Sequence, residues 1–166
     1  GVKQFIEYNK SSKNNEEILC SDNKNSPWLK DKRLPKVYAL GPKILGYAFN
    51  SKLVKWLDIN IKNYDAIIVE GIWQYHNYAV WVTARKYNIP YYVYLHGMLD
   101  PWFQNDPSRK FKAFRNRIYW QLFEKKIINS SSGLLFGSEI EKDLVALTFK
   151  GFNQTNNYVV GNFVTQ

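Results

Sequence analysis

A histidine followed by a glycine stands at the end of a long run of strand-forming residues. Residues 91–95 read Tyr-Tyr-Val-Tyr-Leu, and His96 and Gly97 follow directly. A strand that is apolar over its whole length is typical of a parallel sheet with both faces buried. Open α/β sheets bind ligands outside the carboxyl ends of such strands, and an imidazole there can donate to a hydroxyl or a phosphate oxygen. His96 is therefore the candidate catalytic residue, with a structural role at the strand end as the alternative.

The turn after His96 contains two candidate substrate-binding residues. Gly97 can adopt backbone angles that other residues avoid, which lets a ligand approach the main chain. Asp100 precedes Pro101, and its carboxylate can accept a hydrogen bond from a substrate hydroxyl. An Asp before a Pro is more often a turn former, so both interpretations of Asp100 stay open.

A second group of polar and aromatic side chains follows another strand-forming run, residues 65–70. The loop reads Gly71-Ile72-Trp73-Gln74-Tyr75-His76-Asn77. Aromatic faces pack on sugar rings, while amide and imidazole groups hydrogen-bond to hydroxyls. The candidate substrate-binding residues in this loop are Gly71, Trp73, Gln74 and His76. The alternative is that the aromatic residues belong to the core and that Asn77 caps the next helix.

Positive charge is concentrated in one segment. The net charge is +9, and residues 107–127 contribute +6 of it because they contain seven basic residues and one acidic residue. An apolar stripe recurs there at helical spacing, formed by Phe111, Phe114, Ile118 and Leu122. Basic residues beside such a stripe are typical of a helix that lies in a membrane interface. The candidate membrane or acceptor patch consists of Arg109, Lys110, Lys112, Arg115 and Arg117.

Two other interpretations of this segment stay open. An ordinary amphipathic helix with a solvated basic face has the same composition. Aromatic residues beside basic residues also suit single-stranded nucleic acid. Nucleic acid is the less favoured partner, because the chain contains no recognised RNA- or DNA-binding motif.

The sequence Ser138-Glu139-Ile140-Glu141 has the composition of a helix start. Serine is a preferred N-cap residue, and acidic residues in the first turn interact favourably with the helix dipole. A helix start therefore explains these residue types without a ligand. Glu139 is a candidate for the ligand site only if its side chain faces the cleft.

Several functional classes find no support in the sequence. There is no Walker loop, no nucleophile elbow and no set of His and Cys residues with metal-ligand spacing. We therefore expect neither a metal site nor a bound cofactor. The one cysteine, Cys20, excludes an internal disulfide. No apolar run has the length of a membrane span, and the N-terminus lacks a signal-peptide pattern, so we expect a cytoplasmic protein.

Short apolar runs alternate with amphipathic segments, which predicts an α/β fold. With 166 residues, the chain has the size of a single domain. The predicted strands cover residues 17–21, 37–40, 65–70, 91–95, 133–136 and 158–160. The predicted helices cover residues 2–13, 51–62 (with Ser51 as the N-cap), 77–87, 108–129 and 138–149.

Four segments, taken in order, resemble the N-terminal domain of GT-B-fold glycosyltransferases of family 4 (group 1). The most specific is His-Gly-Met-Leu-Asp-Pro-Trp at residues 96–102, which ends a strand and precedes a basic aromatic helix. Residues 65–73 look like the preceding strand with its ligand-facing loop. Residues 133–141 look like the next strand with the Ser-Glu-x-Glu start of its helix. Residues 158–164 look like the last strand, although Val-Gly-Asn stands where the family has Pro-Asn-Gly.

The resemblance covers residues 65–166 well and residues 1–63 loosely. It implies a Rossmann-like, mostly parallel sheet with helices on both faces. It also implies a retaining hexosyltransferase that moves a sugar from a nucleotide sugar to a glycan or lipid-linked acceptor, in polysaccharide or glycolipid biosynthesis. His96 would lie against the donor sugar and its phosphates, and the leaving phosphate would take the role of the base. The donor nucleotide would be held mainly by a C-terminal domain.

The resemblance further implies that residues 1–166 form one acceptor-side domain of a larger enzyme. Gly1-Val2 look like the tail of the turn after the first strand, and the chain ends where an interdomain linker would begin. We therefore expect the central first strand and the donor-binding domain to be absent, and the fragment alone to be nearly inactive. Loss of a central strand would expose neighbouring strand edges, which a second copy could fill by strand exchange.

Two rival functions stay open beside this interpretation. One is a non-catalytic Rossmann-like nucleotide-binding or regulatory module. The other is a basic single-strand nucleic-acid binder. The expected partners of the favoured function are a nucleotide sugar, a glycan or lipid-linked acceptor, and an anionic membrane surface, which would place the protein peripherally at the inner face of the plasma membrane.

Overall fold

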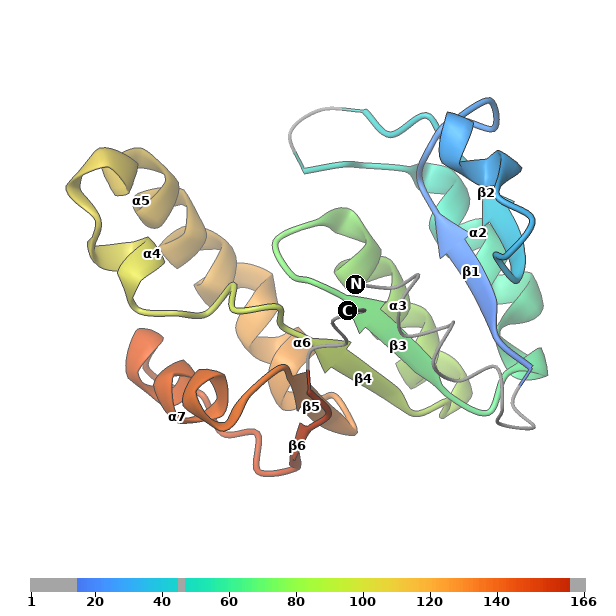
Figure 1. Ribbon diagram of the computed structural model, residues 1–166. Helices are drawn as coiled ribbons and strands as arrows, with labels where there is room; N and C mark the ends of the chain where they lie inside the picture. Colours follow the sequence, from blue (N-terminus) through green and yellow to red (C-terminus); the bar gives the residue numbers. More distant parts are fainter. Residues whose placement is uncertain (1–14, 45–46, 162–166) are drawn as a thin grey trace.

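The computed structural model describes residues 15–44 and 47–161, in which strands and helices alternate along the chain (Figure 1). The strands are β1 (Glu17–Cys20), β2 (Lys36–Ala39), β3 (Ile67–Glu70), β4 (Tyr91–Tyr94), β5 (Gly133–Phe136) and β6 (Asn157–Val159). The helices are α2 (Ser51–Asn60), α3 (Tyr75–Tyr87), α4 (Trp102–Asn105), α5 (Lys110–Tyr119), α6 (Lys125–Asn129) and α7 (Glu139–Thr148). Short 3-10 turns are η1 (Pro27–Lys30), η2 (Ile61–Asn63) and η3 (Pro107–Arg109). The predicted α/β class is confirmed, while the helix predicted for residues 2–13 lies outside the described residues.

The longest helical segment differs from the regular helix that the sequence predicts over residues 108–129. α5 passes directly into a wider π-helical turn, η4 (Trp120–Glu124), which continues into α6. Such turns are rare and often occur at functional sites. Both Trp120 and Glu124 are directed into the interior, where 1% and 0% of their surface is exposed.

Two helix starts also differ from the predicted ones. α2 begins at Ser51, but its N-cap is Asn50, whose side chain accepts a hydrogen bond from the Lys52 N–H. Asparagine and serine are about equally good N-caps, so two adjacent candidates could not be separated by residue type. α3 begins at Tyr75, two residues before the predicted start, and Asn77 therefore lies inside the helix and does not cap it.

All described strands run parallel, but they form two separate sheets. β1 pairs with β2, while β3, β4, β5 and β6 pair in chain order. Within the described residues no hydrogen-bond ladder joins β1 to β3, and the two strands lie apart in Figure 1. The two parts still share one core, because Leu19 of β1 packs against the cluster that the four-stranded sheet and its helices form.

The four-stranded sheet is buried mainly on one face. Val69, Val93 and Leu134 stand side by side in register, and each is at most 2% exposed. α2, α3, α6 and α7 all contribute side chains to the core around them. On the opposite face Ile68 is 42% exposed and Tyr158 is 48% exposed. The prediction that both faces are covered by helices therefore holds for only one face among the described residues.

Candidate functional site

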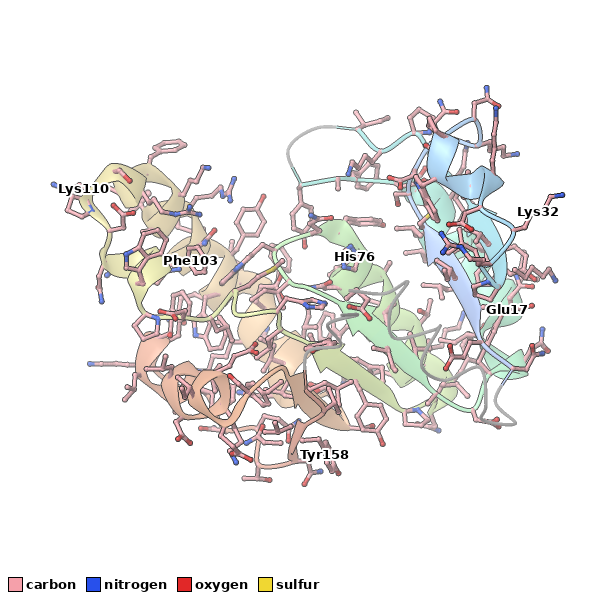
Figure 2. All side chains as sticks on the ribbon, viewed as in Figure 1. Glu17, Lys32, His76, Phe103, Lys110 and Tyr158 are labelled. Atoms are coloured by element: carbon pink, nitrogen blue, oxygen red, sulfur yellow. The ribbon has the colours of Figure 1, made fainter. Side chains whose placement is uncertain are left out.

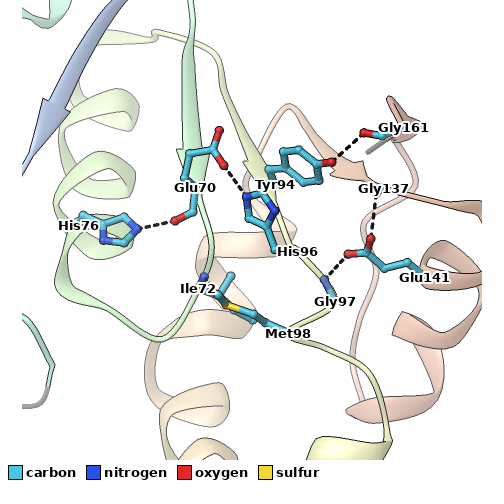
Figure 3. Close-up of polar contacts among 10 residues, drawn as sticks. All are labelled: Glu70, Ile72, His76, Tyr94, His96, Gly97, Met98, Gly137, Glu141 and Gly161. Carbon is cyan, nitrogen blue, oxygen red and sulfur yellow. Dashed lines mark hydrogen bonds and ion pairs between the residues drawn. The ribbon is translucent and has the colours of Figure 1, made fainter. Parts of the chain in front are cut away.

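Three parallel strands end side by side at one edge of the four-stranded sheet, and polar residues follow each of them. Glu70 is the last residue of β3, and His96 and Gly97 follow β4. Gly137 follows β5 and leads into α7, which carries Glu141. Figure 3 shows these residues converging, and we call them the strand-end site. It lies at the edge where open α/β sheets bind ligands.

The His96 imidazole is paired with a carboxylate. Nε2 of His96 contacts Oε2 of Glu70, and each side chain is 30% exposed, so the pair is open to solvent. When Nε2–H donates to Glu70, the neutral ring offers the Nδ1 lone pair as an acceptor, whereas the protonated ring offers Nδ1–H as a donor. The Tyr94 ring stacks on the imidazole with 4.0 Å between ring centroids. His96 is thus an oriented group that can bind a hydroxyl or an anionic oxygen.

The backbone around the strand-end site adopts conformations that most side chains avoid. The φ angle is +51° at His96, +70° at Gly97, +81° at Gly71 and +70° at Trp73. For the two non-glycine residues the left-handed conformation costs on the order of 1–2 kcal/mol each, and such strain is concentrated at functional sites. A Cβ added to Gly97 would meet no atom within 4 Å, so a ligand can approach the main chain there.

Glu141 joins the turns that follow β4 and β5. Its Oε1 accepts from the Gly97 N–H at 2.6 Å, and its Oε2 accepts from the Gly137 N–H at 2.8 Å. Ser138 caps α7 by accepting from the Glu141 N–H at 3.2 Å, which fixes where the carboxylate stands. Converging backbone N–H groups are typical anion-binding groups. The Glu141 carboxylate occupies that place, so an anionic ligand must bind beside it or displace it.

A buried carboxylate holds the loop that follows β3. Glu124 is fully buried, and its Oε1 accepts from the Trp73 N–H at 2.9 Å. Its Oε2 faces Nδ2 of Asn77 at 3.4 Å. Burial raises the pKa of Glu124 to about 7, although the hydrogen bonds from Trp73 and Asn77 act to lower it. Glu124 is therefore a positioning residue for this loop, and its charge changes near neutral pH.

Three predicted substrate-binding residues of this loop have different surroundings. The Trp73 ring packs edge-on against Phe149 with 5.8 Å between centroids, which agrees with the core interpretation of its side chain. A Cβ on Gly71 would lie 3.1 Å from Cε of Met98, so this glycine allows the turns after β3 and β4 to pack closely. Gln74 is exposed at the start of α3, and its side chain makes no cap hydrogen bond.

The fourth residue, His76, lies on the other side of β3 from His96 (Figure 3). Its Nε2 is 3.2 Å from the Glu70 carbonyl oxygen. Burial lowers the pKa of His76, while the hydrogen bond to Glu70 acts to raise it. Glu70 therefore lies between the two histidines and contacts one through its main chain and the other through its carboxylate.

The two predicted acidic site residues make contacts other than those at the strand-end site. Oδ1 of Asp100 accepts from the Trp102 N–H at 2.8 Å, the contact expected of a turn former. Glu139 is exposed and forms an ion pair with Lys142, one turn along α7. It is Glu141, two residues later, that contacts the turn containing Gly97.

The predicted basic patch lies at the opposite end of the molecule from β1 and β2 (Figures 1 and 2). Lys110, Lys112, Arg115 and Arg117 are all exposed on α5. Arg109 precedes α5, and its guanidinium lies over the Phe103 ring, 4.8 Å from the centroid. The structure therefore keeps these cations together on α5 and the turn before it, apart from β1 and β2.

Residues 15–44 and 47–161 contain no group of three His, Cys, Asp or Glu side chains placed to hold a metal ion. None of their helices is both long enough and apolar enough to cross a bilayer. A hollow of about 440 Å³ between α3 and α6, lined by Trp81, Arg85 and Lys126 among others, includes none of the strand-end residues.

No protein-family model matches this chain, and no curated protein or solved structure is significantly similar to it.

Sequence reasoning missed three carboxylates, and each had a recognisable signal. Glu70 is an ionisable residue at the end of an otherwise apolar strand. Glu141 completes a Ser-x-x-Glu capping pattern with Ser138. Glu124 is the single acid in the basic segment, but the sequence holds no sign that it faces the core, because its partner Trp73 lies 51 positions away.

Proposed function

We propose that this chain is the acceptor-side, Rossmann-like half of a GT-B-fold, family-4 glycosyltransferase. The enzyme would transfer a hexose, with retention, from a nucleotide sugar to a glycan or lipid-linked acceptor. The observation that carries the proposal is the pairing of His96 with Glu70 at the carboxyl ends of adjacent parallel strands. It supports the proposal because an oriented, solvent-open imidazole at this edge can bind a sugar hydroxyl or a phosphate oxygen.

The surrounding geometry is consistent with a sugar site of this kind. Gly97 leaves open space beside the main chain, as close approach of a ligand requires. The carboxylates of Glu70 and Glu141 can accept hydrogen bonds from sugar hydroxyls. The donor nucleotide, in this proposal, is held mainly by a second domain, so this chain by itself should show little nucleotide affinity.

The decisive experiment compares His96→Gly with the wild type in the full polypeptide that carries both domains. Without the imidazole, the bound sugar is no longer held in position. Sugar transfer should therefore fall on the order of 100-fold, the effect of misplacing a reacting group by about 1 Å. Glycine tolerates the φ of +51° at this position, so thermal unfolding should change little. A His96→Asn variant, which also tolerates a left-handed backbone and keeps a hydrogen-bonding side chain, should recover part of the rate.

A second measurement separates the rival functions. Isothermal titration of the 166-residue chain with UDP- and GDP-sugars should detect little or no binding. Submicromolar nucleotide binding by the chain alone, with no transfer by the full polypeptide, would overturn the proposal in favour of a nucleotide-binding module. Tight, salt-sensitive binding of an oligo(dT) strand, again without transfer, would favour a single-strand nucleic-acid binder. If His96→Gly transferred sugar as fast as the wild type, His96 would have no role in the reaction.

A further inference from the structure

α5 and η4 have one buried face and one exposed apolar face. The buried face is formed by Ala113 and Asn116 of α5 and continues through η4 with Trp120 and Glu124, and each of these residues is at most 9% exposed. Large apolar side chains are nevertheless exposed on the same stretch: Phe111 (83%), Phe114 (63%), Ile118 (44%) and Leu122 (56%). We call these four residues the outward stripe.

Each outward residue stands two positions before a buried one. Residues two positions apart in a helix point in nearly opposite directions, because successive residues are about 100° apart. Phe114 thus points away from the side on which Asn116 is buried, and Ile118 points away from the side of Trp120. The outward stripe is therefore the side of α5 that faces away from the core, and no described element covers it.

Cations flank the stripe on both sides. The same helical spacing places Lys110 and Arg117 on one flank, and Lys112 and Arg115 on the other. All four are exposed, and none forms an ion pair with an acidic residue in the described part of the chain. Figure 2 shows Lys110 at the outer end of this region, directed away from the body of the molecule.

We propose that the outward face of α5 is a membrane-docking surface that binds a bilayer rich in anionic lipids. The stripe would enter the boundary between headgroups and acyl chains, and the four flanking cations would contact the acidic headgroups. This proposal goes beyond the sugar-transfer function and does not require it.

Charge complementarity selects a lipid surface over a second copy of the chain. Two such faces brought together would oppose four cations to four cations, which is unfavourable. An exposed aromatic stripe bordered by cations on both flanks matches a flat surface that is apolar within and anionic at its rim. A partner protein with an acidic apolar groove has similar chemistry, so the experiment must tell it apart from a bilayer.

The test is co-sedimentation of the 166-residue chain with large vesicles. Vesicles of phosphatidylcholine with a third phosphatidylglycerol should carry most of the protein into the pellet at low salt, whereas pure phosphatidylcholine should carry little. Salt shortens the screening length from about 10 Å at 0.1 M to about 3 Å at 1 M, so binding should weaken but not vanish. The residual part reflects apolar insertion, which salt does not screen.

Matched variants assign the binding to this face. Phe111→Ser combined with Phe114→Ser should remove the salt-resistant part, while Ile140→Ser with Leu147→Ser, also exposed apolar residues, should not. The fourfold Gln variant at Lys110, Lys112, Arg115 and Arg117 should reduce pelleting at least tenfold. A control with the same change in net charge replaces Lys24, Lys30, Lys32 and Lys52, all exposed elsewhere, and should keep most of the binding. Circular dichroism checks that each variant is folded.

Two results would overturn the proposal. One is a wild-type chain that stays in the supernatant with acidic vesicles at low salt, which would leave a protein partner or a solvated face as the explanation. The other is equal loss of binding in the matched charge variants, which would mean that net charge alone attracts the chain to vesicles. Neither result bears on sugar transfer, which His96 variants test separately.

Discussion

The strand-end site and the outward face of α5 present opposite kinds of surface. At the strand ends, the polar groups already have partners within the chain: Glu70 contacts His96, and Glu141 accepts from Gly97 and Gly137. On α5, aromatic side chains such as Phe111 remain exposed, and the cations beside them have no acidic partner among the described residues.

This difference indicates two different kinds of ligand. Groups that are oriented before binding lose little freedom when a small ligand arrives, and the left-handed residues His96 and Trp73 at the strand ends show that the chain tolerates strain to hold them. α5 (Lys110–Tyr119) contains no residue with positive φ. Its regular backbone presents a long row of side chains, which is suited to a broad surface.

The largest expected difference in the free energy of unfolding is between the two faces of the helical segment that begins with α5. Trp120 is 1% exposed and stacks on Phe149 at 4.7 Å, so Trp120→Ala should lower the free energy of unfolding by about 3–5 kcal/mol. Phe111→Ala, on the outward face, should change it by less than about 0.5 kcal/mol. Urea unfolding of both variants gives the comparison. A large loss in Phe111→Ala would show that the outward face is packed after all.

The next largest change in stability concerns Glu124, the buried carboxylate that holds the loop after β3. Burial raises the pKa of Glu124 to about 7 from an ordinary value of 4.5, so the native state binds more protons than the unfolded state between these pH values. The free energy of unfolding should therefore fall as pH rises from about 4.5 to about 7, by about 3 kcal/mol in total.

Glu124→Gln should remove that dependence. Its amide oxygen can accept from the Trp73 N–H. Its NH₂ would replace the oxygen that faces Nδ2 of Asn77, so the Asn77 amide must flip. After that flip, the Gln NH₂ can donate to Oδ1 of Asn77, which lacks a partner among the described residues. The variant should match the wild type near pH 4.5 and be more stable at pH 8, as measured by urea unfolding. Parallel pH profiles of the two proteins would show that Glu124 stays ionised in the fold.

A smaller loss of stability is expected when Glu141, whose carboxylate joins the turns after β4 and β5, is replaced. Glu141→Gln keeps one acceptor oxygen for the two N–H groups of Gly97 and Gly137, and should cost about 2 kcal/mol, the scale of a hydrogen bond to a charged group. Glu139→Gln on the same helix is the control, because its exposed ion pair with Lys142 should contribute less than about 1 kcal/mol. Equal losses would remove the distinction between the two glutamates.

The smallest effect is expected at Gly97. With a φ of +70° and no atom within 4 Å of an added Cβ, Gly97→Ala should cost about 1 kcal/mol, from backbone strain alone. Thermal unfolding measures this cost. A much larger loss would mean that the space beside Gly97 is filled, and that the main chain there is closed to a ligand.

Local patterns were enough to predict most elements and the position of the strand-end site. The strand predicted at residues 91–95 is observed as β4 (Tyr91–Tyr94), and it follows from a run of β-prone residues that stops before a His-Gly pair. The outward stripe follows from the spacing of Phe111, Phe114, Ile118 and Leu122. The helix start at Ser138, which is the N-cap of α7, follows from its place before two acidic residues. Each of these signals lies within a few neighbouring residues, so no knowledge of the fold is needed.

Tertiary structure alone decided which groups meet. Glu70 reaches His96 across 26 positions and Glu141 reaches Gly97 across 44, because parallel strands bring distant residues to one edge of the sheet. It also decided that Ile68 remains exposed while Val69 is buried, since an apolar run does not reveal which of its faces is covered. For α5, the sequence by itself determined an apolar stripe with basic neighbours. Only the packing of Ala113, Asn116 and Trp120 against the core shows that this stripe faces outward, because periodicity defines the faces of a helix but not the side on which the rest of the protein lies.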